Sequence, residues 1–243
     1  MKFSDILKAI LQSIPFLFYL IITRPFYVYA YHFNRLTFFK ACGFGLKLFL
    51  FYLRIKLSIY GTELFPKPGR KFLIVANHQS FIDIFIIESI LPCAFIQRPV
   101  PYIPGFSWYF GKSSLIIDKE SPLSILKAVR YAKQVAIDQG IPVALFPEST
   151  RSIDGRLGEL QLGAATIAKT LNLPVLPVTI YNSKEIMPKG TIYAKPGVVL
   201  VAIQPLIEER FIKNHSVEEL NHEIKQRIQK GLDYLGQVRQ ESL

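Results

Sequence analysis

His78 and Asp83 lie five residues apart in the segment Val75-Ala-Asn-His-Gln-Ser-Phe-Ile-Asp-Ile-Phe85, where an apolar strand gives way to an apolar helix. Ser80 is a good N-cap residue and Asp83 stands at the N3 position, so residues 80–83 match a capping box. On a straight helix His78 and Asp83 would point about 140° apart. An N3 carboxylate, however, reaches back past the N-cap, so Asp83 can accept the ring N–H of His78. Such a pairing fixes the tautomer of a histidine and stabilises its imidazolium when the other ring nitrogen takes a proton.

A purely structural interpretation of this segment stays open, with Asp83 as a helix cap and His78 as a polar turn residue. Two other chemistries fit the sequence less well. No second His or Cys stands near His78 at the spacing of metal ligands, so no metal site is expected. The sequence has no GxSxG motif, which argues against a serine hydrolase. The chemistry that remains is a His–Asp base that acts directly on a substrate hydroxyl.

A second group of polar residues follows another apolar strand, in Leu145-Phe-Pro-Glu-Ser-Thr-Arg-Ser152. Pro147 stops the strand, and Glu148, Thr150 and Arg151 then project from a loop. Arginine can grip a phosphate with two N–H groups, while Glu148 can accept from a substrate hydroxyl or orient the arginine. An ordinary polar loop is the alternative interpretation.

Seven apolar runs of strand length must position these groups, and several are continuous, as in strands buried on both faces. The runs are Ile55–Tyr60, Lys71–Ala76, Ala94–Gln97, Ser114–Ile117, Val143–Phe146, Val175–Ile180 and Val198–Ile203.

Helices are indicated between the strands by their start and stop residues. Ser121-Pro122 opens a helix that Gly140 ends, Gly163–Asn172 forms a short helix, and the capping box Ser216-Val-Glu-Glu219 starts a helix that runs to about Leu235. The alternation of helices and strands predicts an α/β fold, a mixed, mostly parallel sheet flanked by helices.

The N-terminal quarter of the chain is apolar and strongly basic at the same time. Residues 1–60 contain eight Lys or Arg and one acidic residue, and so hold +7 of the net charge of +11. A nucleic-acid-binding arm would be basic and polar, so no nucleic-acid partner is expected, and an anionic membrane surface is favoured.

Two apolar stretches within residues 1–54 predict a membrane anchor. Ala9–Thr23, which Gln12, Ser13 and Pro15 interrupt, is shorter than the ~20 residues of a spanning helix.

Leu36–Leu53 contains Lys40 and Lys47 and is followed by Arg54, three basic residues spaced by seven and so near one stripe of a helix. A span would carry these charges into hydrocarbon at roughly 3 kcal/mol each, whereas a helix in the interface would place them among the headgroups. We therefore predict a two-helix anchor at 1–54, embedded in one leaflet, and a second domain at 55–243. A true span and a helix packed on the protein's own domain are the alternatives.

Four sequence blocks together resemble the glycerolipid acyltransferase family over about residues 55–210. Asn77 and His78 through Asp83 match the family's NHxxxxD block, and Phe146–Arg151 resembles its FPEGTR block. Gly111 with Leu115–Lys119 is similar to the intervening glycine and FIDR-type block, and Leu173–Val178 resembles the fourth block. Bacterial 1-acyl-sn-glycerol-3-phosphate acyltransferases are the members that the chain most resembles.

The resemblance implies a role for each matching residue. His78 is the catalytic base and Asp83 orients it, while Asn77 belongs to the same block and is expected at the substrate. Glu148, Ser149, Thr150 and Arg151 line the acceptor site, with Arg151 on the acceptor's phosphate. Lys119 stands where the family has arginine, and Pro177 and Val178 shape the side of the acyl donor.

Two departures from the family pattern bear on the acceptor. Ser149 replaces the glycine of FPEGTR, which adds a side chain where the backbone needs a close approach or a positive φ. Lys119 offers a point charge in place of the planar guanidinium fork.

The implied reaction transfers an acyl chain from acyl-CoA or acyl-acyl carrier protein to the free hydroxyl of lysophosphatidic acid, giving phosphatidic acid. No cofactor and no metal are expected. The expected partners are membrane lipid and lysophosphatidic acid, with acyl carrier protein as a further partner if it is the donor. The expected location is the cytoplasmic face of a membrane, which for a bacterial protein is the inner membrane. Another lysophospholipid or glycerol 3-phosphate as acceptor, or a non-catalytic lipid-binding role, are the alternatives.

Overall fold

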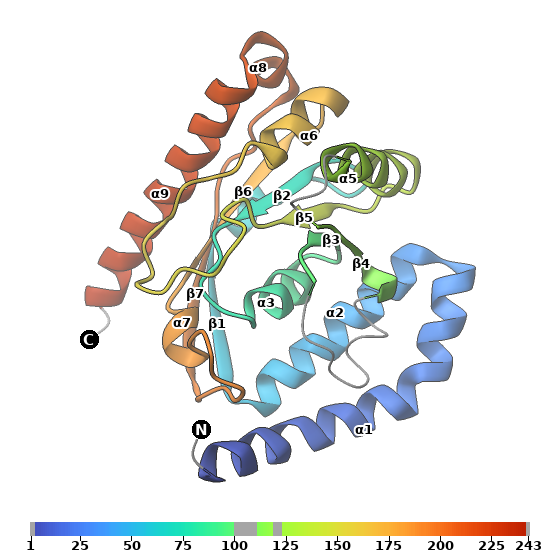
Figure 1. The fold of residues 1–243 in the computed structure, drawn as a ribbon, viewed down its shortest axis with the longest axis vertical. Coiled ribbons are helices and arrows are strands. Elements are labelled where there is room, and N and C mark those ends of the chain that lie inside the picture. Colours follow the sequence, from blue (N-terminus) through green and yellow to red (C-terminus); the bar gives the residue numbers. More distant parts are fainter. Residues whose placement is uncertain (1–2, 100–110, 119–122, 242–243) are drawn as a thin grey trace.

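The computed structural model describes residues 3–99, 111–118 and 123–241 of the chain (Figure 1). Its centre is a seven-stranded sheet with the order β1-β7-β6-β2-β5-β3-β4. The strands are β1 (Ile55–Tyr60), β2 (Leu73–Ala76), β3 (Ala94–Gln97), β4 (Ser114–Ile116), β5 (Val143–Leu145), β6 (Val175–Tyr181) and β7 (Gly197–Ile203). All seven predicted strands are confirmed, with bounds that shift by at most two residues.

Neighbouring strands are parallel throughout, except for the antiparallel pair β6 and β7. The predicted mixed, mostly parallel sheet is therefore confirmed. Strands β2 and β5 are buried along their whole length, and β6 is buried up to its last residue. Burial on both faces explains why these strands have continuous apolar sequences in place of an alternating pattern.

Helices cover both faces of the sheet (Figure 1). The α-helices are α1 (Phe3–Phe33), α2 (Arg35–Tyr52), α3 (Asp83–Ile90), α5 (Ser124–Ala132), α6 (Gly163–Leu171), α7 (Ser183–Ile186), α8 (Glu209–Asn214) and α9 (Val217–Glu241), with a 3-10 turn η1 (Thr62–Leu64) and a π-helical turn η2 (Lys133–Asp138). On one face α2 packs against α3, and on the other α9 packs against β6 and β7 with α6 beside it.

The capping box predicted at Ser216–Glu219 is confirmed, whereas the helix that it starts runs to Glu241 and not to about Leu235. Ser216 N–H donates to the Glu219 carboxylate at 2.7 Å, and Glu219 N–H donates to Ser216 Oγ at 3.1 Å, which is the reciprocal pair of a capping box. Gly140 follows η2 with a φ of +67°, the left-handed conformation that ends helices. The predicted start at Ser121-Pro122 lies outside the described residues.

Helix α2 is packed on the domain along one side. Its buried side chains, among them Phe38, Phe39, Cys42 and Leu46, belong to the same core cluster as the strands of the sheet. At Gly43 a Cβ would lie 2.5 Å from the main-chain oxygen of Glu88, so the glycine permits the close approach of α2 to α3. The predicted division at residue 54 stays a prediction, and the core continues across it.

The other side of α2 and much of α1 are exposed. Lys40 and Lys47 are exposed on α2, as the predicted stripe requires, but Arg54 lies beyond the helix with a φ of +56°. The prediction was wrong for Arg54 because the chain must turn at that residue to enter β1, which pairs with β7 from Ile55. None of the helices in the described part of the chain combines the length and the apolar composition that crossing a bilayer requires.

Gly231 of α9 provides a test of how tightly this helix packs on β6. A Cβ at this position would lie 2.1 Å from Thr179 Oγ1, and the Thr179 hydroxyl donates to the Ile228 carbonyl. We expect Gly231→Ala to lower the free energy of unfolding by about 1–3 kcal/mol, because overpacking outweighs the better helix propensity of alanine.

Gly236→Ala is the matched control on the same helix. There the nearest atom, in the ring of Tyr181, would be 3.9 Å from the new Cβ. This variant should gain up to about 1 kcal/mol from helix propensity alone. Urea denaturation of both variants measures the difference, and equal effects of the two substitutions would contradict the packing described for α9.

Candidate active site

Four neighbouring parallel strands, β6, β2, β5 and β3, end at one edge of the sheet. Segment 77–82 follows β2, segment 146–152 follows β5, Arg98 follows β3 and segment 182–196 follows β6. Ligands in open α/β sheets bind outside the carboxyl ends of the strands, so this edge is where a site is expected.

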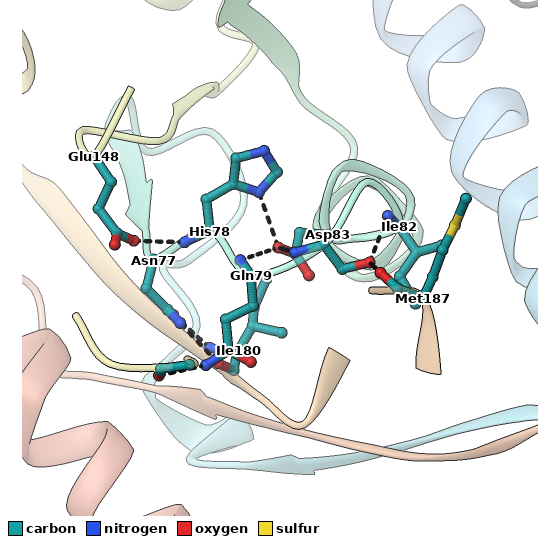
Figure 2. A network of polar contacts seen from close by, with 10 residues as sticks. Asn77, His78, Gln79, Ile82, Asp83, Glu148, Ile180 and Met187 are labelled. Atoms are coloured by element: carbon teal, nitrogen blue, oxygen red, sulfur yellow. Dashed lines mark hydrogen bonds and ion pairs between the residues drawn. The ribbon is translucent and has the colours of Figure 1, made fainter. Parts of the chain in front are cut away.

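His78 and Asp83 are in contact at this edge, as their spacing predicts. His78 Nδ1 lies 2.9 Å from Asp83 Oδ2, and the Asp83 side chain is fully buried (Figure 2). The same oxygen accepts from the main-chain N–H groups of Gln79 and Ser80, each at 2.7 Å. A carboxylate only accepts, so Nδ1 carries the hydrogen and Nε2 carries the lone pair. Figure 2 shows Nε2 on the side of the ring that faces away from Asp83.

Only half of the predicted capping box at residues 80–83 is formed. Ser80 N–H donates to the Asp83 carboxylate, as predicted, but Ser80 Oγ donates to the main-chain oxygen of Met187 at 2.7 Å. The helix α3 accordingly begins at Asp83 with Ile82 as N-cap, and not directly after Ser80. The serine thus ties the turn to the segment that follows β6.

Asn77 bonds the turn after β2 to the neighbouring strand β6. Its side chain donates to the Ile180 carbonyl at 2.8 Å and accepts from the Ile180 N–H at 2.7 Å. Both ends of the buried amide are therefore used on β6, and Asn77 is not part of the cavity lining. The residue was predicted at the substrate, and the structure places it beneath the site, where it joins β2 to β6.

Glu148 is likewise bound to main chain. One carboxylate oxygen accepts from His78 N–H at 2.7 Å and the other from Gly158 N–H at 2.9 Å. Burial raises the pKa of Glu148, and the two N–H donors oppose that shift in part. Glu148 was predicted in the acceptor site, but it is not part of the cavity lining and instead joins the loop after β5 to the His78 turn. The bond from Ser152 N–H to the His78 carbonyl, at 2.8 Å, joins the same two segments.

A cavity of about 320 Å³ opens beside His78. One part of its wall is apolar, with Phe81, Ile84 and Ile96, and another part is cationic, with Arg151. The ring of Phe146 stacks on His78 with centroids 4.1 Å apart, which fixes the plane of the imidazole. The predicted residues Ser149, Thr150 and Arg151 all line this cavity together with His78.

Three other predicted residues are not brought to the cavity. Pro177 and Val178 lie within β6, buried in the sheet opposite Val75 and Ala76, and they are not part of the cavity lining. Their expected role on the acyl-donor side stays a prediction without a contact to carry it. Lys119 lies outside the described residues.

Two cationic residues of the cavity were missed. Arg98 donates to the Ser149 carbonyl at 3.1 Å, and Lys189 donates to the Thr150 hydroxyl at 3.2 Å. Both line the cavity. Arg98 directly follows a predicted strand, so the rule that ligands bind at the carboxyl edge could have found it. Lys189 lies eight residues past the end of β6, where no sequence signal marks it.

The fold and the site together define an α/β protein whose cavity joins a base, a cationic wall and an apolar wall. Comparison with known proteins gives the family. A sequence model of the family described as Acyltransferase matches residues 56–181, just over half of the chain, and the chain therefore belongs to this family. The predicted resemblance is confirmed.

Relatives and a solved structure agree with the family. The chain is 25% identical to the 1-acyl-sn-glycerophosphate acyltransferase PlsC from Thermotoga maritima, whose crystal structure superposes with a TM-score of 0.80 over 96% of this chain and 98% of that one. A 1-acyl-sn-glycerol-3-phosphate acyltransferase of Pseudomonas aeruginosa is 27% identical over 74% of this chain and 70% of its own length. One of Chlamydomonas reinhardtii is 32% identical over 61% of this chain and 46% of its own length. The chain spans about half the length of the algal and plant relatives that it matches.

Ser149, which the resemblance places at the glycine of the FPEGTR block, adopts a left-handed conformation with a φ of +58°. A side chain in this region costs about 1–2 kcal/mol relative to glycine, partly offset by the greater freedom of glycine in the unfolded chain. We therefore expect Ser149→Gly to be more stable than Ser149→Ala by about 1 kcal/mol. Thermal unfolding of the two variants measures this. A less stable glycine variant would mean that the side chain at 149 carries a contact that outweighs the strain.

Proposed function

We propose that the protein transfers an acyl chain from an acyl thioester to the free hydroxyl of 1-acyl-sn-glycerol 3-phosphate, which gives phosphatidic acid. One observation carries the proposal: a His–Asp pair, with Nε2 available as the acceptor of a proton, borders a cavity that also contains Arg151. The names of the similar acyltransferases support the same acceptor.

The reaction is a direct transfer. The acceptor hydroxyl gives its proton to His78 Nε2 while its oxygen attacks the thioester carbonyl carbon. The C–S bond then breaks, and the departing sulfur takes the proton back from the imidazolium. Asp83 keeps the hydrogen on Nδ1 and stabilises the imidazolium between these two steps. Neither a covalent acyl-enzyme nor a cofactor is required, and either coenzyme A or acyl carrier protein serves as the thiol carrier.

The walls of the cavity suit a lysophospholipid acceptor. Arg151 can bind the phosphate of the acceptor with two N–H groups, and the apolar wall formed by Phe81, Ile84 and Ile96 can take its acyl chain. The phosphate and the hydroxyl of this acceptor are close together, so a phosphate on Arg151 presents the hydroxyl to His78, the residue on the same cavity that can accept a proton.

We further propose that α1 and α2 hold the protein at a membrane surface by lying in one leaflet. Exposed apolar side chains follow α1 from Leu7 to Phe33, and Phe44, Leu48 and Phe51 are exposed on α2. Lys40 and Lys47 stand among them. A face of this kind, with long basic side chains that reach headgroups, is typical of helices in the membrane interface. The cytoplasmic face of the membrane is the setting that fits the acyl thioester donor.

Substitution of His78 tests the reaction. In a thioester-consumption assay of detergent-solubilised protein with 1-acyl-sn-glycerol 3-phosphate, His78→Ala should lose at least ~100-fold in turnover, the low end of what a general base supplies. Asp83→Asn should cost nearly as much, because the control of the tautomer is lost. His222→Ala, at an exposed histidine of α9, is the control and should keep full turnover. Near-normal turnover of His78→Ala would remove the base from the mechanism.

Substitution of Arg151 tests the acceptor. Arg151→Ala should lose about 2–4 kcal/mol in kcat/KM for the phosphate-bearing acceptor, because charge-assisted contacts are the strong kind. The apparent KM for the thioester should stay close to that of the wild type, and Arg151→Lys should recover only part of the loss. Arg156→Ala removes an exposed arginine that is not part of the cavity lining and is the matched control. If wild type and Arg151→Ala discriminated equally against a monoacylglycerol without phosphate, Arg151 would not hold the phosphate.

Charge reversal on α2 tests the anchor. The double variant Lys40→Glu and Lys47→Glu should bind anionic vesicles more weakly, by about 1 kcal/mol for each basic residue removed from the surface. The control is the double variant Lys213→Glu and Lys230→Glu, which changes the net charge by the same amount. Its two positions are exposed on α8 and α9, on the side of the sheet opposite to α2. This control should bind nearly as the wild type does. Equal losses in the two double variants would mean that net charge alone, and not the face of α2, governs binding.

A further inference from the structure

Segment 187–196, which joins α7 to β7, lies between the cavity and the beginning of α1. In Figure 1 it is the orange loop that runs beside the dark blue start of α1. The loop contacts three separate parts of the molecule: the cavity, helix α1 and the turn that contains His78.

The first contact is with the cavity. Lys189 lines it, and the Lys189 ammonium donates to the Thr150 hydroxyl at 3.2 Å. Lys189 lies in a tight turn that is closed by Thr191 N–H donating to the Pro188 carbonyl at 3.0 Å. Gly190 has the positive φ, +89°, that the third position of a type II turn requires. The turn therefore holds the backbone of Lys189 in place at the cavity.

The second contact is with α1. The Gln12 side chain donates to the Ala194 carbonyl at 2.7 Å and accepts from the Ala194 N–H at 2.9 Å. Ala194 is only 4% exposed, so its main-chain groups depend on this amide for hydrogen bonds that water would otherwise supply. Next to this pair, the Lys8 ammonium lies over the ring of Tyr193, 5.1 Å from its centroid. Gln12 is one of the residues that interrupt the apolar run Ala9–Thr23, and its side chain is used in this contact.

The third contact is with the turn that carries the catalytic base. The main-chain oxygen of Met187 accepts from Ser80 Oγ, two residues after His78. At the other end of the loop, Lys195 N–H donates to the Ile186 carbonyl at 2.8 Å and closes its base. Lys189 thus lies in a loop that is closed at Ile186 and Lys195 and bonded to α1 at Ala194.

The charge of Lys189 suits the acceptor. An ammonium has three N–H donors, and the Thr150 hydroxyl takes one of them, so two remain for an anion. Arg151 and Arg98 line the same cavity. Several cations facing one small space are costly when the space holds only water, and a phosphate monoester, with a charge of nearly −2, offsets their repulsion.

We propose that Lys189 is a second contact for the acceptor's phosphate, and that Gln12 of α1 is the positioning residue that keeps Lys189 at the cavity. The inference rests on the proposed acyl transfer to a phosphate-bearing acceptor. It adds that the acceptor site is complete only when α1 is docked on the loop. The helix that meets the membrane and the subsite that selects the substrate are therefore coupled.

The experiment compares single and double variants of the full chain in detergent. Lys189→Ala should raise the KM for 1-acyl-sn-glycerol 3-phosphate about tenfold, the lower end for a hydrogen bond to a charged group, with little change in kcat or in the thioester KM. Lys189→Arg should restore most of the loss. Lys195→Ala removes an exposed lysine of the same loop that does not line the cavity, and it should leave the acceptor KM unchanged.

Gln12→Ala should raise the same KM by about threefold and should add nothing to Lys189→Ala, because the two residues act through one contact. Ser13→Ala, at the exposed neighbour of Gln12, is its control. Multiplicative losses in the double variant would overturn the positioning role of Gln12. An acceptor KM of Lys189→Ala equal to that of Lys195→Ala would overturn the phosphate contact.

A binding measurement separates this inference from the proposed function. Calorimetric titration of lysophosphatidic acid into the His78→Ala protein, with and without Lys189→Ala, requires no turnover. About tenfold weaker binding by the variant with both His78→Ala and Lys189→Ala supports the contact between Lys189 and the phosphate. This conclusion holds even if the wild type consumes no thioester, a result that would reject only the proposed reaction. Equal binding, with the wild type active, would reject Lys189 and leave the reaction standing.

Discussion

One oxygen of Asp83 accepts hydrogen bonds from His78 Nδ1 and from the N–H groups of Gln79 and Ser80. A carboxylate that is fully buried is stable only where donors surround it, so the turn after β2 and the histidine ring are held by the same charge. The orientation of the His78 ring is therefore a consequence of how helix α3 begins. Removal of this carboxylate would leave two main-chain donors and one ring nitrogen without their partner at the same time.

The remaining contacts of the site brace this turn from the neighbouring strands. Asn77 fixes it to β6, Glu148 and Ser152 fix it to the loop after β5, and Ser80 fixes it to Met187 beyond α7. Because β6, β2 and β5 are parallel neighbours, the contacts of Asn77, Glu148 and Ser152 cross only from one strand to the next. The shared direction of these strands thus lets short polar side chains join their ends, and the cationic residues Arg98, Arg151 and Lys189 line the cavity beside them.

The fold was predictable because its central strands are buried on both faces and some of its helices carry strong start and stop residues, such as the Ser216–Glu219 box. The His78–Asp83 contact was predictable for a local reason, since a carboxylate at the start of a helix reaches back over the preceding turn. The positive φ of Ser149 follows from its place at a family glycine. Contacts between distant segments were not predictable. Glu148 is of a residue type that suits an acceptor site, but its carboxylate accepts from the main-chain N–H groups of His78 and Gly158. Gln12 reads as an interruption of an apolar run, and its partner, Ala194, lies 182 residues away in the sequence.

The proposed acyl transfer depends most directly on which nitrogen of His78 carries the hydrogen when the imidazole is neutral. Nitrogen-15 NMR of protein labelled in its four histidines reports this, and the spectrum of His78→Gln identifies the resonances of His78. The proposed mechanism requires the hydrogen on Nδ1, facing Asp83, and an unprotonated Nε2. A neutral His78 with its hydrogen on Nε2 would contradict it, because that nitrogen could then not accept the proton of a substrate hydroxyl.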